Sequence, residues 1–368
     1  MEPNQPIGPD FTALLARVRP DVDQRLLTRW NAEIERLGRH GADVVAIADA
    51  ARDLTMRGGK RFRAALVVAA YAGVAPDAPI EHAYQAGVAL ELLQTYLLIQ
   101  DDWIDGDMTR RGGPAAHAAL AARLGSAHLG AACAVLASDF TWGLAIGVLA
   151  GIELPAQRTL DAVRLVMAVH QDVVIGQALD VFGHAEDVEV MHDLKTGSYT
   201  VRGPIALGAT LAGADAATLD ALQRYAVPLG VAFQLRDDLL GTFGTPDETG
   251  KPVGNDLRAG KRTAILAEAE ARLSGTERAA LERAFGHGEA TDAEVLAATA
   301  ALETCGARAA VATRLAGLCA EAQGRAAALP ITTAGQAWLS GAAAALAPGV
   351  VTTTMVEPGS AATRGAHA

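Results

Sequence analysis

The stretch Glu91–Gly113 reads ELLQTYLLIQDDWIDGDMTRRGG and combines an apolar run with a cluster of acidic and basic residues. Apolar residues at three- and four-residue spacing over 79–105 predict a helix that ends in a run of carboxylates. Asp101 and Asp105 are four residues apart, so they share one helix face, one turn from each other. Two carboxylates with an open side suit Mg²⁺, which takes oxygen ligands and bridges to substrate phosphates. By itself, this pattern is also compatible with a solvated acidic helix end.

The same helical spacing covers most of the chain on both sides of this stretch. The 368 residues are 51% hydrophobic but only 4% aromatic, and much of the apolar fraction is alanine and leucine, which favour helices. We therefore expect an all-α protein with one large helical domain at 11–348 and disordered tails at 1–10 and 349–368. Helices are expected at about 22–37, 43–56, 79–105, 126–150, 155–184, 198–213, 216–242, 262–286 and 291–328.

The charge balance, the apolar runs and the cysteines limit the partners and the compartment. With 31 basic and 42 acidic residues, the chain has a net charge of −11, so nucleic acid, which needs a basic footprint, is excluded as a partner. The most apolar stretch, 129–152, is interrupted by Asp139 and is too short after it for a membrane span, so we expect a buried core helix. Three cysteines without metal-ligand spacing, and an N-terminus without a signal-peptide pattern, indicate a soluble, cytoplasmic protein.

Basic residues follow the first acidic motif directly. Arg110 and Arg111 come shortly after Asp105 and precede two glycines. They could form surface ion pairs, which contribute little to stability, or they could bind a phosphate in the bidentate manner that suits arginine. The combination of DDxxD with RRG is more specific than either half alone.

A second acidic pair and three more basic segments lie elsewhere in the sequence. Gln234–Gly241 reads QLRDDLLG at the end of a predicted helix, and Gly250–Arg262 reads GKPVGNDLRAGKR. Gly58–Arg63 reads GGKRFR where a helix begins, and Lys195–Thr200 reads KTGSYT between two apolar helices. Glycines let the backbone approach a phosphate closely, and helix starts attract anions. Together these segments predict sites for two diphosphate groups, one held through metal and one through lysine and arginine.

These motifs occur in the order typical of the trans-isoprenyl diphosphate synthases, or polyprenyl synthetases, and the chain resembles that family from about residue 58 to 263. The motifs are GGKRFR, ELLQ, QDDWIDGDMTRRGGPAAH, GQALD, KTGSY, FQLRDDLLGTFG and TGKPVGNDLRAGKRT. The resemblance implies an isoprenoid synthase fold with a central pocket between helices. It also implies a Mg²⁺-dependent prenyltransferase that condenses isopentenyl diphosphate with an allylic diphosphate, and a homodimer.

The resemblance further implies roles for individual residues. The Mg²⁺ ligands would be Asp101, Asp105 and Asp237, with Asp102 and Asp238 beside them. The allylic diphosphate would be supported by Arg110, Lys195 and Lys251, with Lys261 as a further substrate-binding residue. Isopentenyl diphosphate would be held by Gly59, Lys60, Arg63, Gln94 and Arg111. The catalytic groups facing the allylic cation would be backbone carbonyls near Lys195 and Thr196 and the amide oxygen of Gln234.

Two positions bear on metal affinity and product length. The second motif has Gly241 where the family usually has a third aspartate, which puts metal affinity in doubt more than activity. Tyr96, five residues before Asp101, matches the position at which bulky residues close the product pocket in this family. A single aromatic there, without an insertion in DDWID, resembles geranylgeranyl diphosphate synthases, so we expect a twenty-carbon product, with a fifteen-carbon product second. Tyr96 could instead be only a core aromatic, because it lies about 140° round the helix from Asp101.

Two other functions would share part of this pattern. A class I terpene cyclase would have the helical fold and a DDxxD motif, but it would not need GGKR or the KTGSY lysine. A non-catalytic subunit of a heteromeric synthase would be expected to lose aspartates of the first motif, yet Asp101, Asp102 and Asp105 are all present. A prenyl diphosphate synthase therefore explains more of the sequence than either alternative.

Overall fold

The computed structural model describes residues 10–183, 188–245 and 253–348, and helices form almost all of its regular structure. The helices of the first half are α1 (Phe11–Gly38), α2 (Ala42–Met56), α3 (Phe62–Val74), α4 (Glu81–Ile104), α5 (Ala116–Leu124), α6 (Ala127–Ala150) and α7 (Ala156–Phe182). The second half contains α8 (Val188–His192), the π-helix η1 (Asp193–Arg202), α9 (Gly203–Ala212), α10 (Ala216–Phe243), α12 (Asn255–Arg258), α13 (Ala264–Glu270), α14 (Gly275–Ala284), α15 (Asp292–Thr304), α16 (Ala307–Ala326) and α17 (Thr333–Ala344). The all-α prediction is confirmed, whereas the predicted tails lie, apart from Asp10, outside the described residues.

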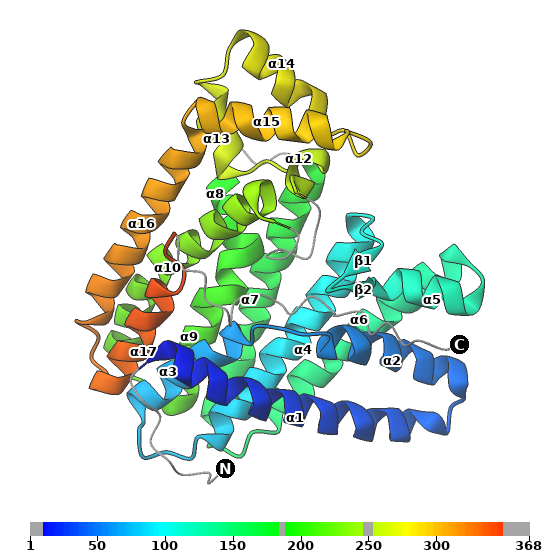
Figure 1. Ribbon diagram of the computed structural model, residues 1–368. Helices are drawn as coiled ribbons and strands as arrows, with labels where there is room; N and C mark the ends of the chain where they lie inside the picture. The colour runs from blue at the N-terminus through cyan, green and yellow to red at the C-terminus, as the bar shows by residue number, and fades with distance from the viewer. Residues whose placement is uncertain (1–9, 184–187, 246–252, 349–368) are drawn as a thin grey trace, which may run out of the picture.

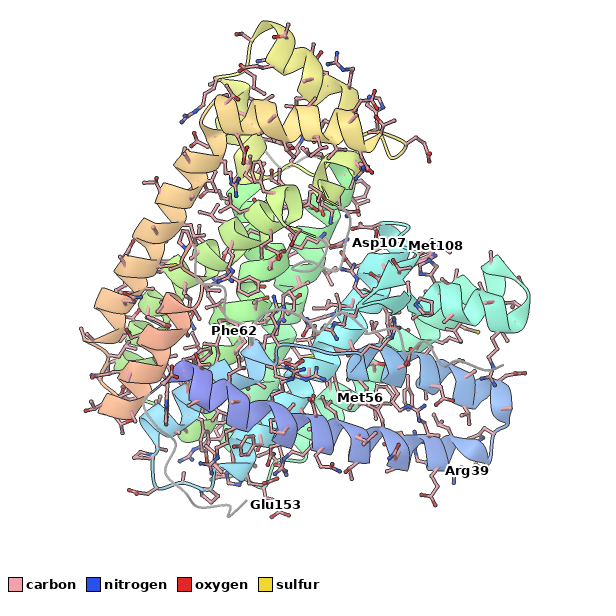
Figure 2. The ribbon with its side chains drawn as sticks, viewed as in Figure 1. Arg39, Met56, Phe62, Asp107, Met108 and Glu153 are labelled. Carbon is pink, nitrogen blue, oxygen red and sulfur yellow. The ribbon has the colours of Figure 1, made fainter. Side chains whose placement is uncertain are left out.

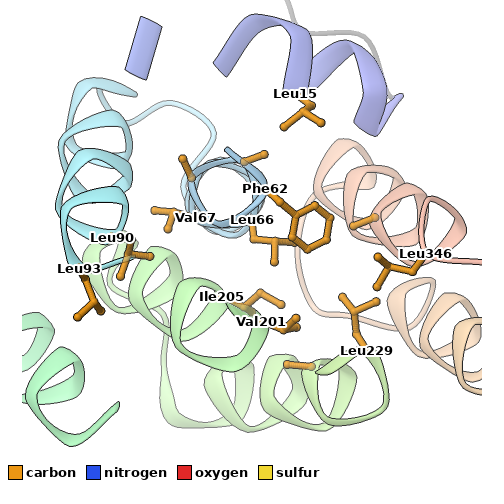
Figure 3. Packing of buried hydrophobic residues seen from close by; sticks show 14 of the residues in the cluster. Leu15, Phe62, Leu66, Val67, Leu90, Leu93, Val201, Ile205, Leu229 and Leu346 are labelled. Atoms are coloured by element: carbon orange, nitrogen blue, oxygen red, sulfur yellow. The ribbon is translucent and has the colours of Figure 1, made fainter. Parts of the chain in front are cut away.

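Helix α3 lies at the centre of the array, and α1, α4, α9 and α17 pack around it (Figure 3). Every residue from Phe62 to Tyr71 is buried. The sequence indicated that a helix begins near Gly58–Arg63, but it gave no bounds for it. The reason is physical: a helix that is apolar on all sides has no polar face, so no 3.6-residue stripe stands out. One buried hydrophobic cluster extends from Phe11 to Leu346 around this helix.

Two long predicted helices are each broken in the structure. The segment 291–328 forms α15 and α16, which meet at an angle of 62°. Gly306 lies at this break with a φ of 80°, in the left-handed region where glycine commonly ends or redirects a helix. The segment 262–286 likewise divides into α13 and α14, with Ser274 preceding the second helix. The sequence predicted one helix in each segment because apolar residues keep their three- and four-residue spacing across both breaks.

The apolar stretch 129–152 forms α6, but only one face of this helix is buried. Within α6 and α7, windows long and apolar enough to cross a membrane are less than half buried. Large exposed apolar side chains of these helices are Leu129, Val135, Leu136, Leu160, Met167, Val174, Ile175, Val181 and Phe182. The prediction of a buried core helix at 129–152 therefore holds for one face of α6 only, and α6 and α7 both expose broad apolar faces.

Helix α4 ends beside a small β-hairpin, made by β1 (Thr109–Arg110) and β2 (Gly113–Pro114), at one edge of the molecule (Figure 1). Asp107 and Met108 lie in the turn that connects α4 to this hairpin (Figure 2). The sequence predicted a connector at this place but no strand pairing, because two-residue strands give no periodic signal. The hairpin holds Arg110 and Arg111 next to the aspartates that end α4.

Candidate active site

The two acids on one face of α4 both point at lysines from distant segments. The Nζ of Lys195 lies 3.4 Å from Oδ1 of Asp101, and the Nζ of Lys261 lies 3.6 Å from Oδ2 of Asp105. The like charges that would destabilise an isolated helix are thus neutralised from η1 and from the segment before α13. The predicted common face of Asp101 and Asp105 is present, and the structure joins it to two of the predicted lysines.

Lys195 also contacts Asp180 of α7, a residue to which the sequence analysis gave no role. Its Nζ lies 2.5 Å from Oδ2 of Asp180, so one ammonium group bridges α4 and α7. The approach of α7 to η1 depends on Gly176, because a Cβ there would lie only 2.3 Å from the backbone nitrogen of Lys195. Both Gly176 and Asp180 belong to the GQALD motif, which is the signal that could have found them.

Charge and burial act against each other throughout this cluster. Burial raises the pKa of Asp101, but the positive charges of Lys195 and Arg110 outweigh it and hold that pKa below its usual value. Burial and the neighbouring charge of Asp101 raise the pKa of Asp105. Burial lowers the pKa of Lys195, but the charges of Asp101 and Asp180 raise it by more. Asp101 is therefore held as a carboxylate by cations that a bound metal ion could displace.

The acids of the site fit a Mg²⁺ ion that also binds a phosphate, and not an ion that protein ligands surround on all sides. Within the described ranges, no three histidine, cysteine or carboxylate side chains gather closely enough to enclose a metal. Asp101 and Asp105 form one wall, and the charges of Asp237 on α10 and Asp180 on α7 both act on His192. Mg²⁺ commonly uses one or two carboxylates and completes its shell with water and substrate phosphates. Asp101 and Asp105, one turn apart at the end of α4, meet that requirement.

Arg110 is held by three carboxylates of the first acidic segment. Its Nε donates to Oδ1 of Asp102 at 2.5 Å, and its Nη2 lies 3.2 Å from both Asp101 and Asp107. Burial raises the pKa of the Asp102 carboxyl to about 6, even though Arg110 opposes the shift. Arg57 fixes the hairpin by donating to the backbone oxygens of Arg110 and Pro114, each at 2.7 Å. No sequence signal marked Arg57 for this role.

The residues predicted to hold isopentenyl diphosphate lie around the start of α3 and the end of α2. Arg63 is buried, donates from Nη2 to Oγ1 of Thr200 at 2.7 Å, and stacks 4.3 Å from the ring centroid of Tyr199. Arg111 donates to the backbone oxygen of Leu54 in the last turns of α2. Lys60, in the loop between these helices, is half-buried.

Gln94 and Gly59 are the other two residues predicted to hold isopentenyl diphosphate, and they lie on α4 and in the loop between α2 and α3. Gln94 is half-buried on α4, seven residues before Asp101 and therefore close to the same face. Gly59 has a φ of 156°, and a Cβ there would lie 2.7 Å from Nη1 of Arg61. That arginine is buried and pairs with Glu91 at 2.7 Å, so it anchors the loop and does not face a substrate.

The second acidic motif gives its two aspartates different surroundings. Asp237 is exposed, whereas Asp238 is buried and accepts hydrogen bonds from Nε2 of Gln234 at 2.7 Å and from the backbone nitrogen of Ala264 at 2.9 Å. Burial raises the pKa of Asp238 to about 6 against these hydrogen bonds. The Oε1 of Gln234 is buried and has no hydrogen-bond partner among the described residues. Lys251 lies outside the described residues.

Tyr96 belongs to a cluster of three rings that joins α4, α6 and α7. Its hydroxyl lies 2.9 Å from Nε2 of His170, and His170 stacks on Trp142 with ring centroids 4.4 Å apart. A cavity of about 290 Å³ lies between α4 and α6, with Gln100, one turn after Tyr96, in its wall. Of the three rings, only Tyr96 has a signal in the sequence, because the other two come from distant segments without a motif.

The family is decided by a match over most of the chain. Residues 44–302 match the polyprenyl synthetase family. The chain belongs to the polyprenyl synthetase family. Among its relatives, a geranylgeranyl diphosphate synthase from Mycobacterium tuberculosis is 38% identical over 258 residues, which cover 67% of this chain and 69% of the relative. A (2E,6E)-farnesyl diphosphate synthase from Mycobacterium bovis is 35% identical over 319 residues, 82% of this chain and 84% of the relative.

Solved structures agree with this family. A geranylgeranyl pyrophosphate synthase from Corynebacterium glutamicum, complexed with isoprenyl diphosphate and magnesium, superposes with a TM-score of 0.85 at 30% identity. The match covers 91% of this chain and 99% of that structure. The predictions of a polyprenyl synthetase and of a prenyltransferase of the geranylgeranyl or farnesyl diphosphate synthase type are confirmed.

Proposed function

We propose that this polyprenyl synthetase condenses isopentenyl diphosphate with allylic diphosphates and makes geranylgeranyl diphosphate as its main product, in a Mg²⁺-dependent reaction. The observation that carries the proposal is the convergence of Asp101 and Asp105 on Lys195 and Lys261, two cations that come from η1 and from the segment before α13. This arrangement brings carboxylates suited to Mg²⁺ and ammonium groups suited to a diphosphate into one place. Farnesyl diphosphate is the alternative product.

The allylic diphosphate is held at the charged end of the site. Asp101, Asp105 and Asp237 would hold Mg²⁺, which supplies positive charge to a diphosphate leaving group when bound. Lys195 and Lys261 already lie against the acids, so the same ammonium groups can contact diphosphate oxygens once a metal neutralises the carboxylates. Arg110, fixed by Asp102, adds a guanidinium to this side of the site. Lys251, which lies outside the described residues, would be a further cation for this diphosphate.

The reaction develops a positive charge on the allylic carbon as its bond to the diphosphate breaks. The double bond of isopentenyl diphosphate attacks that carbon, and a proton then passes to the released diphosphate. The unpaired Oε1 of Gln234 is suited to face this charge, as are carbonyls of the π-helix near Lys195 and Thr196. A π-helix is rare and is often found at functional sites, which supports this role. Apolar walls exclude water, which would otherwise capture the cation.

Isopentenyl diphosphate would occupy a second anion site around the loop between α2 and α3. Lys60, Arg63 and Arg111 provide three cations there, and Gln94 approaches from α4. The contact of Arg63 with Thr200 links this site to η1, which carries Lys195. The two diphosphates would thus lie on either side of one π-helix.

The three rings of Tyr96, Trp142 and His170 are proposed to close the product pocket. Tyr96 lies about 7.5 Å along α4 from Asp101, and the stacked rings behind it give that position rigid support. Trp142 and His170 make the floor wider than a single tyrosine would. A rigid floor at this depth supports a short-chain product.

The exposed faces of α6 and α7 are proposed to bind a second copy of the chain rather than a membrane. Leu160, Met167, Val174 and Val181 repeat at intervals of seven residues on α7, and all four are exposed. An apolar seam with this period is typical of helices that pack against another helix. A homodimer through this seam accounts for the apolar helices without a membrane span, and we propose a cytoplasmic enzyme with one domain at 11–348.

The activity is tested by incubating purified protein with labelled isopentenyl diphosphate and each allylic primer, and then separating the extracted products. We expect a twenty-carbon diphosphate that forms with Mg²⁺ and is lost when EDTA removes the metal. A cyclic hydrocarbon would instead indicate a terpene cyclase, and no product from any primer would contradict the proposed activity.

A further inference from the structure

The structure gives a specific reason for the glycine that ends the second acidic motif. Gly241 follows Asp237 by four residues on α10, so the two share a face. A Cβ added at Gly241 would lie 1.9 Å from Oδ2 of Asp256 and 2.6 Å from its Cγ. The carboxyl group of Asp256 therefore fills the space that a side chain at position 241 would need.

The segment that carries Asp256 is anchored, so this placement is built into the fold. Gly254 precedes α12 with a φ of 66°, a conformation that glycine adopts without strain. Arg258 donates to the backbone oxygens of Val253 at 2.8 Å and Ala290 at 3.1 Å. The adjacent Leu257 is buried. These contacts fix the turn on both sides of Asp256.

Asp256 lies next to Lys261, a cation that also contacts the first acidic motif. The backbone nitrogen of Lys261 donates to the backbone oxygen of Asp256 at 2.9 Å. The Nζ of Lys261 lies 3.6 Å from Oδ2 of Asp105. Asp256 is therefore near the point where the wall of α10 meets the wall of α4.

We propose that Asp256 supplies, from the segment between α10 and α13, the carboxylate that position 241 lacks. It then acts as a positioning residue for Mg²⁺ held between Asp237 and the first motif. This inference rests on the proposed function, because it assigns a role in the same metal site. It also explains why glycine is needed at position 241, since any larger residue would displace the Asp256 carboxyl group.

The test is a cycle of variants whose metal binding is measured directly. Mg²⁺ binding in the presence of inorganic diphosphate is followed by isothermal titration calorimetry for wild type, D256S, D256N, G241D and the double variant G241D/D256S. We expect about tenfold weaker binding for D256S and D256N. G241D should bind more weakly and melt at a lower temperature, because two carboxyl groups compete for one space. The double variant should recover metal affinity to within about threefold of wild type.

The controls separate this inference from the proposed function. D220S removes an exposed acid from the other end of α10 and should change nothing. Unchanged metal affinity in D256N, or a double variant no better than D256S, would overturn the role of Asp256 even if wild type makes the prenyl product. If G241D fails to fold, D256N still decides, because it keeps the shape of the side chain and removes only its charge. A wild-type protein that binds no Mg²⁺ with diphosphate would contradict the proposed function itself.

Discussion

Asp101 is a carboxylate that contacts two cations of the proposed site. It lies 3.4 Å from Lys195 and 3.2 Å from Arg110, yet both cations have other carboxylate partners. Asp101→Ala should therefore abolish prenyl transfer while changing the free energy of unfolding by less than about 1 kcal/mol. Turnover with Mg²⁺ and urea unfolding measured on the same preparation check both parts. Asp220→Ala, an exposed acid, is the matched control, and near wild-type turnover in Asp101→Ala would contradict the metal assignment.

Arg63 and Arg61 are neighbouring buried arginines with different expected roles. Arg63→Met should raise the KM for isopentenyl diphosphate about ten- to a hundredfold, the equivalent of roughly 1.5–3 kcal/mol for a lost charged contact. The KM for the allylic primer should stay nearly unchanged. Arg61→Met should instead destabilise the protein by about 3–5 kcal/mol, because it leaves Glu91 buried without its partner. Steady-state kinetics with each substrate varied in turn tests the difference, and equal KM effects of Arg63→Met would contradict two separate sites.

The sequence predicted the charged side chains of the site but not the residues that hold them in place. Asp101, Lys195 and Lys261 belong to recognisable motifs, and the structure brings them together. Arg57 and His170 act through contacts with residues 53 and 74 positions away in sequence, and neither lies in a chemical motif. Such long-range partners follow from the packing of helices, which one sequence does not specify.

The close packing of α7 against η1 requires a glycine at position 176. Gly176→Ala would place a Cβ 2.3 Å from the nitrogen of Lys195, so the two helices must separate. We expect a loss of about 1–3 kcal/mol in stability from overpacking and at least a tenfold fall in turnover. Gly317→Ala on α16 is the matched control, because no atom lies within 4 Å of its added Cβ. That change should stabilise the helix by about 0.5–1 kcal/mol, and a similar gain in Gly176→Ala would contradict the close approach.

The proposed floor of the product pocket also depends on several elements, since its rings come from α4, α6 and α7. Tyr96→Ala should open the floor and shift the products from twenty carbons to longer chains, as measured by chromatography of the extracted prenols. Tyr84→Ala removes a tyrosine of similar burial three turns earlier on α4, and it should leave product length unchanged. An unchanged product length in folded Tyr96→Ala would place the floor elsewhere.

The sequence predicted long helices with clear boundary residues better than short or interrupted ones. The long helices α4, α6, α7 and α10 lie close to the predicted segments, because glycine, proline, serine or aspartate marks their ends. Helix α3 is short and buried on all sides, and the break at Gly306 was hidden by an apolar spacing that continues through it. The π-helix η1 also had no local signal, and its close approach to α7 depends on Gly176 of that helix.

At the scale of the whole molecule, the exposed seam of α7 predicts a homodimer in solution. Val174 lies in the middle of the seven-residue repeat and is 47% exposed, so a second copy would bury it. Val174→Glu should shift the protein from dimer to monomer in sedimentation velocity at micromolar concentration, because a buried, unpaired carboxylate costs several kcal/mol. Leu296→Glu, an equally drastic change at an exposed leucine of α15 outside the seam, should leave the dimer intact. A wild-type protein that sediments as a monomer, or that is recovered with membranes, would show that something other than a second copy covers this face.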